Sequence, residues 1–445
     1  MSREHRGTNR AANVSHVFVQ SGVAAPRRAS SLALLATAAV AAALWGGAAI
    51  ALFPWAGGYN AGDLAHYHET ARRLLGGAVP YRDFAFEYPP LALVPITIPG
   101  ALLGAGVDSA PHYHFALLAL NAACAALMGA CVLRLARHVA PGMHPSTVGA
   151  WYAALVFIGV PLFPWRFDLF VALLTAAGLL LAIERRPAWA GVALGAAIAT
   201  KVYPAVMVPV IVAWYVAAGD RRGAIRCATA AAATALLAMA PFYAAAPRQF
   251  FSFVTYQGTR GFQVESLVAG LVLLRHAIEG TAVELVENFG AVHLAAMPAA
   301  GVQVALVVAM CAGVALTAWL AFARFRAECA GGVGSGPRAR TLVTASFAAV
   351  VAFMVLNKVL SPQYLAWLLP FAPLAAPAAF ALTAVATVLT ITVFPCLYVG
   401  LVHVEPLPVL VLNARNVTLL ALAAYLLWSL RPALARAPAA AGRVG

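Results

Sequence analysis

The stretch DFAFEYPPLALVPITIPGALLG, residues 83–104, decides how the chain is threaded through a membrane. It is apolar enough to begin a membrane-spanning helix, yet it contains four prolines and places Glu87 and Tyr88 directly before the first of them. Interior prolines remove helical hydrogen bonds and kink the axis, so this segment makes a poor continuous span. We therefore predict a short, kinked helix along the membrane surface, with Tyr88 extended before the proline.

The whole chain has the composition of a membrane protein. Of its 445 residues, 63% are hydrophobic and only 10% are charged, and the mean hydropathy is +0.85. A water-soluble fold of this length would not bury so much apolar surface, which predicts an all-α polytopic membrane protein. The net charge of +14 would suggest nucleic acid in a soluble protein. Here we assign the basic residues to topology and expect no nucleic-acid partner.

Apolar runs recur along the chain, each near the length that crosses a bilayer or somewhat shorter. We predict a disordered cytoplasmic N-terminus at 1–30, one transmembrane domain at 31–430 with long outer loops at 54–111 and 244–297, and a cytoplasmic tail at 431–445. The runs predict about twelve spans, at roughly 32–53, 112–133, 147–163, 168–183, 187–200, 202–218, 227–243, 298–322, 341–357, 364–378, 379–396 and 416–430.

The distribution of charge predicts the orientation of these spans. If residues 89–105 also crossed, the basic clusters at Arg134, Arg185 and Arg221 would face outward, against the positive-inside rule. With that segment on the outer surface, the inner side carries 19 of the 29 Lys and Arg residues and 4 of the 15 Asp and Glu residues. We therefore predict a multi-pass plasma-membrane protein whose unusual polar clusters face the extracytoplasmic side.

The first outer loop holds candidate catalytic carboxylates. Asp63 precedes apolar residues spaced for one face of a short amphipathic helix, which Gly76 and Gly77 would end. Two compatible roles for Asp63 stay open, an N-cap of this helix and a general base at the membrane surface. Glu87 and Asp83 are rival bases.

Three polar residues close to Asp63 raise the alternative of a metal site. His66, His68 and Glu69 are residue types that bind divalent metals. On successive positions of a surface helix, however, such residues more often face water. We predict no metal and no other cofactor.

Two further motifs place a cation on the predicted outer side. The short runs that flank Lys201 form an outward hairpin, 186–219, with this lysine at its tip. A lone lysine there would most often snorkel to lipid headgroups. Arg260 stands beside two glycines that let its guanidinium approach an anion closely; the alternative is an ordinary loop arginine paired with Glu265. Ser266 could cap the apolar stretch that follows.

The last cationic motif is NKVLSPQYLAW, residues 357–367. Lys358 precedes Ser361, a candidate N-cap, and Pro362, which suits the first position of a helix. A helix N-terminus beside a cation is a favourable phosphate site.

Three cations and one or more carboxylates on one side suit the transfer of a group from a lipid phosphate. The cations would stabilise charge on the departing phosphate, and a carboxylate would take the proton of an incoming hydroxyl. A glycoside hydrolase would instead need two carboxylates that bracket one bond.

These motifs resemble the GT-C superfamily of membrane glycosyltransferases and, most closely, glycosyltransferase family 87, the polyprenyl-phosphate-mannose-dependent type. The matching stretches run in order from the first outer loop to the tenth predicted span. They are the Asp63 loop, FEYPPLAL (86–93), ATKVYPAVMVP (199–209), RGFQVES (260–266) and LSPQYLAWLLPF (360–371). The His66/His68 pair and the segment 280–293 match no defined subgroup.

The resemblance implies a GT-C-like bundle and an inverting transfer from a polyprenyl-phosphate sugar to a glycolipid or glycan hydroxyl, without a nucleotide sugar. The catalytic aspartate of the family falls on Asp63. Mannose is the family default, and arabinose or another sugar stays open. The predicted substrate-binding residues are Glu87, Tyr88, Lys201, Tyr203, Arg260, Glu265, Lys358, Gln363 and Tyr364.

Two other functional classes are alternatives. A transporter or a flippase for lipid-linked sugars would place ionisable residues near the bilayer midplane, and the predicted spans hold no Asp or Glu between their ends. A scaffold protein would explain the apolar runs but not the polar clusters of the outer loops.

Overall fold

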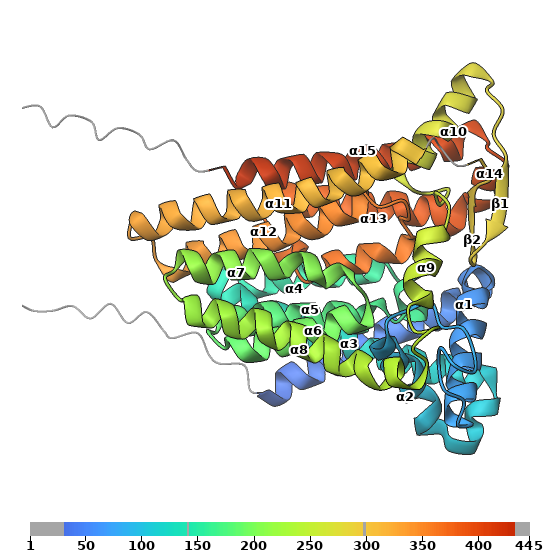
Figure 1. Ribbon diagram of the computed structural model, residues 1–445, viewed down its shortest axis with the longest axis horizontal. Helices are drawn as coiled ribbons and strands as arrows, with labels where there is room; N and C mark the ends of the chain where they lie inside the picture. Colours follow the sequence, from blue (N-terminus) through green and yellow to red (C-terminus); the bar gives the residue numbers. More distant parts are fainter. Residues whose placement is uncertain (1–30, 140–141, 297–299, 432–445) are drawn as a thin grey trace, which may run out of the picture.

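The computed structural model describes residues 31–139, 142–296 and 300–431. In these residues the chain is a bundle of α-helices with one two-stranded hairpin at one end (Figure 1). The chain is thus an all-α polytopic membrane protein, as its composition predicts. The predicted disordered segment 1–30 and all of the predicted tail beyond residue 431 lie outside the described residues.

Six described helices are long and apolar enough to cross a membrane, so the predicted number of about twelve spans is not confirmed. They are α3 (Ala110–Val139), α8 (Arg221–Ala245), α11 (Ala300–Ala330), α12 (Ser335–Val355), α13 (Pro377–Ile391) with the turn that continues it, and α15 (Pro406–Ser429). Shorter apolar helices lie among them, namely α4 (Pro145–Ile158), α5 (Asp168–Ile183), α6 (Pro187–Thr200) and α7 (Met207–Ala217).

The two ends of the bundle differ in character (Figure 1). The loop end carries α2 (Leu93–Leu103), α9 (Ser252–Thr259), α10 (Leu267–Glu279), β1 (Leu285–Asn288), β2 (Ala291–Leu294) and α14 (Tyr398–Val402). The opposite end, which we call the basic end, holds the arginine-rich turns. Three contacts join those turns: Arg134 pairs with Glu184 at 2.5 Å, Arg340 donates to the Val139 carbonyl, and Arg324 donates to the Arg431 carbonyl. The chain enters α1 and leaves α15 toward the basic end.

Helix α1 (Ser31–Leu75) is continuous and contains Pro54 in its interior. Asp63 therefore lies in mid-helix, and its predicted role as the N-cap of a separate helix is wrong. The face that was predicted to be apolar is buried at Leu64, Tyr67 and Ala71, and this packing keeps the helix intact beyond the proline. The end of the helix is as predicted, with Gly77 at a φ of +90°.

The proline-rich segment forms a 3₁₀ turn, Pro90–Ala92, followed by α2. With 11 residues, α2 is roughly 16 Å long and too short to cross a bilayer. The Tyr113 hydroxyl of α3 donates to the Ile96 carbonyl at 2.8 Å, which fixes α2 against the bundle. The prediction of a short helix in place of a span is confirmed, whereas its depth in a membrane stays a prediction.

The predicted hairpin around Lys201 is present. Helix α6 ends at Thr200, and a 3₁₀ turn, Tyr203–Val206, leads into α7. Helix α6 packs very closely on α8, because a Cβ added at Gly195 would lie 2.4 Å from the Ala231 carbonyl oxygen. This close packing fixes the height of Lys201 at the loop end.

The run 364–378 was predicted as a span, but it is not a continuous helix. It folds into two 3₁₀ turns, Pro362–Leu368 and Ala372–Leu374, because prolines recur through it. Ser361 precedes the first turn, with Pro362 at its first position, yet the serine hydroxyl makes no capping bond. The predicted α-helical N-terminus at Ser361 is therefore wrong.

Candidate active site

A cavity of about 1130 Å³ lies at the loop end. Asp63 and the nine predicted substrate-binding residues all line its wall, although they come from segments far apart along the chain. They are Asp63, Glu87, Tyr88, Lys201, Tyr203, Arg260, Glu265, Lys358, Gln363 and Tyr364. Their roles in binding or catalysis stay predictions.

Asp63 projects from α1 and forms an ion pair with Arg166. The Arg166 Nη2 and Asp63 Oδ2 atoms are 2.6 Å apart, and the arginine side chain is only 4% exposed against 34% for the aspartate. Arg166 directly follows the 3₁₀ turn Phe163–Trp165, whose three residues are buried. A buried guanidinium thus fixes one oxygen of the partly exposed carboxylate, and the other oxygen makes no ion pair with the described residues and is available to the cavity.

Lys201 is neutralised by a second carboxylate, Asp168, the first residue of α5. The Lys201 Nζ and the Trp367 Nε1 each lie 2.7 Å from Asp168 Oδ1, and Asp168 is 1% exposed. The ammonium also lies 5.2 Å from the ring centre of Tyr364 and 5.3 Å from that of Trp367. Its charge is therefore compensated by the protein itself.

Two of the predicted tyrosines build an aromatic wall. Tyr203 and Tyr364 stack on Trp367, with ring centres 4.1 Å and 3.8 Å away. Tyr203 also hydrogen-bonds Thr175 of α5. This stack holds the Trp367 indole toward Asp168 and gives the cavity a rigid apolar side.

Arg260 is oriented by a histidine of the hairpin. Its Nε donates to His293 Nε2 at 3.0 Å, while His293 Nδ1 lies 3.0 Å from the Ala291 carbonyl oxygen, to which it can donate. Burial and the neighbouring Arg260 lower the pKa of His293 to about 4, so the imidazole is neutral and accepts at Nε2. The alternative pairing of Arg260 with Glu265 does not occur.

Lys358 lies near Arg260 in the wall of the cavity. Its Nζ donates to the Gly258 carbonyl at 2.8 Å, and burial and the charge of Arg260 lower its pKa. Within the described part of the chain, the ion pairs include neither Lys358 nor Arg260. The cavity therefore contains two neighbouring cations that form no ion pair with a carboxylate of the described residues.

Glu265 is a buried carboxyl at the cavity wall. Its Oε2 accepts from Gln263 Nε2 at 3.1 Å, and its main-chain carbonyl accepts from Arg415 Nη2 at 2.6 Å. Burial raises the pKa of Glu265 to about 7, against a smaller opposite effect of Arg415. The next residue, Ser266, caps α10 as predicted, since its Oγ accepts from the Ala269 N–H.

The rival bases differ in position. Asp83 accepts from the Val79 N–H at 2.7 Å and pairs with Arg82 at 2.8 Å; these partners lower its pKa to about 2, and it is not part of the cavity lining. Glu87 lines the cavity beside Tyr88. The geometry thus favours Asp63 and Glu87 over Asp83.

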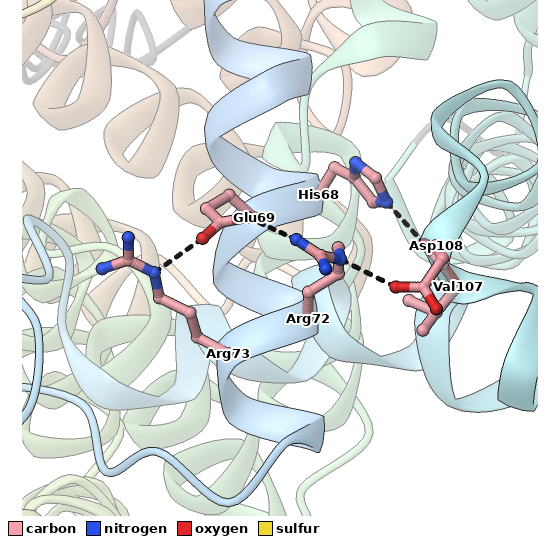
Figure 2. Close-up of polar contacts among 6 residues, drawn as sticks. All are labelled: His68, Glu69, Arg72, Arg73, Val107 and Asp108. Atoms are coloured by element: carbon pink, nitrogen blue, oxygen red, sulfur yellow. Dashed lines mark hydrogen bonds and ion pairs between the residues drawn. The ribbon is translucent and has the colours of Figure 1, made fainter.

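The polar residues after Asp63 are mostly used in local contacts, as Figure 2 shows. His68 Nε2 lies 2.5 Å from the Val107 carbonyl, and Glu69 pairs with Arg72 and Arg73. In the described ranges no group of three His, Cys, Asp or Glu side chains is placed to hold a metal. His66 lines the cavity.

Sequence reasoning missed Arg166, Asp168 and His293. The signal was weak, because Arg166 and Asp168 stand in WRFD between two apolar runs and resemble the polar ends of spans. His293 stands in the segment that matched no known pattern. Their partners are far away in the chain, so only the fold reveals the pairings.

One of two comparisons with known proteins finds a match. The search of curated proteins gives no match to the chain. The model of glycosyltransferase family 87 matches residues 86–356, more than half of the chain, so that Asp63 precedes the matched region and Lys358, Gln363 and Tyr364 follow it. The chain is therefore a multi-pass membrane protein that belongs to glycosyltransferase family 87.

Proposed function

We propose that this protein is an inverting glycosyltransferase that moves a sugar, by family default mannose, from a polyprenyl-phosphate donor to a hydroxyl of a glycolipid or glycan. The reaction would take place on the extracytoplasmic face of the plasma membrane. The family supports sugar transfer itself, and the cavity supports the donor class.

The observation that carries the donor class is the pair of neighbouring cations that lack an ion-pair partner among the described residues. Burial lowers the pKa of Lys358, and Arg260 lies close enough to lower it further; both cations line the same cavity as Asp63. Two neighbouring cations without an anion are costly unless a ligand brings negative charge. A phosphate matches both their charge and their hydrogen-bonding capacity.

In the proposed reaction, one residue takes the proton of the acceptor and two others stabilise the leaving group. The acceptor hydroxyl gives its proton to Asp63 Oδ1, because Oδ2 is held by Arg166. The acceptor oxygen then bonds to the anomeric carbon while the bond from that carbon to the phosphate oxygen breaks. The polyprenyl phosphate leaves with the electron pair, and Arg260 and Lys358 stabilise its charge. A single displacement of this kind inverts the anomeric centre.

The proposed role of Lys201 differs from that of Arg260 and Lys358. Because Asp168 already neutralises it, it offers less attraction to an incoming phosphate. We propose that Lys201 acts mainly through the shape of the cavity wall, together with Tyr203, Tyr364 and Gln363.

The placement of the cavity supports the proposed side of the membrane. The arginine-rich turns lie at the basic end, and the cavity is lined by residues of the loop end. Figure 1 shows that these are opposite ends of the bundle. If the basic end is cytoplasmic, the cavity faces a compartment without nucleotide sugars, where a lipid-linked donor is required.

The test is sugar transfer by the purified protein in proteoliposomes that contain polyprenyl-phosphate mannose and a glycolipid acceptor extract. We expect Asp63→Asn to lower the turnover number at least a hundredfold, roughly the scale of a lost general base. Asp83→Asn, at an exposed carboxylate outside the cavity, is the matched control and should transfer normally. Normal turnover by Asp63→Asn would assign the base to Glu87, and no transfer by the unmodified protein would contradict the donor class.

A further inference from the structure

The proposed phosphate site poses a mechanical question, because its two cations lie on separate segments. Arg260 belongs to the segment between α9 and α10, and Lys358 follows α12. The two charges repel each other, and this repulsion adds to the effect of burial in lowering the pKa of Lys358. A contact between the segments must hold the cations together before any phosphate arrives.

Gln263 makes that contact with its main chain and its side chain. Its N–H donates to the carbonyl of Lys358 itself at 3.0 Å. Its Oε1 accepts from the Leu360 N–H at 3.0 Å and from the Ser361 hydroxyl at 3.3 Å. Gln263 is only 4% exposed, so these bonds are shielded from competing water.

The other end of the same amide is also bonded. The Nε2 atom of Gln263 donates to Glu265 Oε2 at 3.1 Å, and Glu265 is held through its main chain by Arg415 of α15. An amide offers a donor and an acceptor on one planar group. The orientation of the Gln263 amide follows from these partners. The end that accepts from the Leu360 N–H is the oxygen, and the end that donates to the Glu265 carboxyl is the nitrogen.

The hairpin is joined to the same junction. The Leu294 N–H donates to the Phe262 carbonyl, and the Val264 N–H donates to the Val292 carbonyl, so residues 262–264 extend the pair β1–β2. His293, which orients Arg260, therefore moves together with Gln263. Displacement of Gln263 would change the position of both cations at once.

We propose that Gln263 is a positioning residue that sets the separation of Arg260 and Lys358, and so the affinity for the phosphate of the donor. The proposal rests on the phosphate role proposed above for these two cations. Gln263 itself need not touch the phosphate. Loss of the Gln263 side chain should weaken the binding of the donor and of the polyprenyl-phosphate product together, with a smaller effect on the binding of the acceptor.

A swap of the two side chains tests this. Gln263→Glu places a carboxylate beside Glu265 and removes the donor to it, and we expect the donor KM and the inhibition constant of polyprenyl phosphate to rise roughly tenfold. In the double variant Gln263→Glu/Glu265→Gln, the new carboxylate accepts from the Leu360 N–H, from the Ser361 hydroxyl and from the amide introduced at position 265. We expect the inhibition constant to return to within about threefold of the original value.

The controls separate the two proposals and a folding defect. Gln249→Glu makes the same change at an exposed position of the loop end and should leave both constants unchanged. Glu265→Gln alone gives the baseline for the double variant, and thermal unfolding in detergent monitors the fold. Unchanged constants for Gln263→Glu, an equal rise of donor and acceptor KM, or no recovery in a folded double variant would overturn the positioning role. Absence of inhibition of the unmodified protein by polyprenyl phosphate would instead contradict the proposed function.

Discussion

The ion pair between Asp63 and Arg166 determines how the proposed base is presented. Arg166 is buried, while Asp63 is partly exposed. The arginine therefore holds the carboxylate of Asp63 in a fixed orientation. A planar guanidinium fixes the orientation of a carboxylate better than an ammonium does. Orientation at this point should therefore affect the chemical step more than the binding of the donor.

We expect Arg166→Lys to lower the turnover number by about tenfold, with little change in donor KM, because the charge is kept while the fixed geometry is lost. Arg166→Gln should be worse and should also unfold at a lower temperature, since it leaves Asp63 without its partner. Steady-state kinetics with varied donor concentration give both values. A large rise in donor KM with unchanged turnover would place Arg166 in donor binding instead.

The carboxyl of Glu265 gives a pH-dependent prediction. Its pKa is raised from 4.5 to about 7, so between these values the folded protein holds a proton that the unfolded chain has released. This contribution to stability is present below pH 4.5 and is lost as the pH rises through about 7. The side chain of Glu265→Gln does not titrate, so the variant lacks this loss of stability with rising pH. From about pH 5 to about pH 7.5 its free energy of unfolding should rise by up to about 3 kcal/mol relative to that of the original protein.

The measurement is the midpoint of thermal unfolding of both proteins at several pH values. His293, whose pKa is lowered to about 4, gives a slope of opposite sign between about 4 and 6.5. This effect of His293 is present in both proteins and cancels when the midpoint of one is subtracted from that of the other. A difference that does not change with pH would contradict the raised pKa of Glu265.

At the scale of elements, the hairpin β1–β2 carries an unfavourable turn. Phe289 and Gly290 connect the strands with φ values of +50° and +67°, a geometry that favours Asn and Gly and disfavours a bulky residue. Phe289 nevertheless lines the cavity and packs edge-on against Tyr256 at 4.9 Å. Strained residues of this kind are found at binding sites.

We expect Phe289→Asn to stabilise the hairpin by up to about 1 kcal/mol and to lower kcat/KM several-fold, because the strain and the ring are lost together. Phe289→Leu keeps an apolar side chain and the strain, and it is the matched comparison. Thermal unfolding and transfer kinetics give the two values. A variant with both lower stability and full activity would contradict a role for the ring in the cavity.

Elements with a strong local signal were predicted well. The hairpin around Lys201, the short helix after Pro89 and the cap at Ser266 follow from proline, serine and the lengths of apolar runs. The break before Asp63 was wrong, because Pro54 indicates a helix end locally while the burial of Leu64 and Tyr67 keeps α1 continuous. Tertiary packing of this kind is not visible in a local pattern.

The site shows the same limit. Single cations and carboxylates could be selected from the sequence as catalytic or substrate-binding candidates, and all of them except Asp83 line one cavity. Which cation is neutralised could not be predicted, since Asp168 and Lys201 are 33 residues apart and Arg260 and His293 also 33 apart. The distinction between Lys201 and the pair Arg260/Lys358 comes from the fold alone.

At the scale of the whole molecule, the two unlike ends predict the sidedness of labelling. In intact cells, a membrane-impermeant maleimide should modify a cysteine placed at Glu284, which is exposed at the loop end. A cysteine placed at Arg222, exposed at the basic end, should react only after the cells are opened. The reverse pattern would place the cavity in the cytoplasm and contradict a lipid-linked donor.

The course of the chain at the basic end has a practical consequence. Helix α1 starts and helix α15 finishes there (Figure 1), away from the loop-end residues that line the cavity. An affinity handle joined directly to the start of α1 or to the end of α15 can therefore hold the enzyme on a solid support with its loop end facing the liquid. Bulky glycans could then be screened as acceptors on immobilised protein without steric obstruction from the matrix.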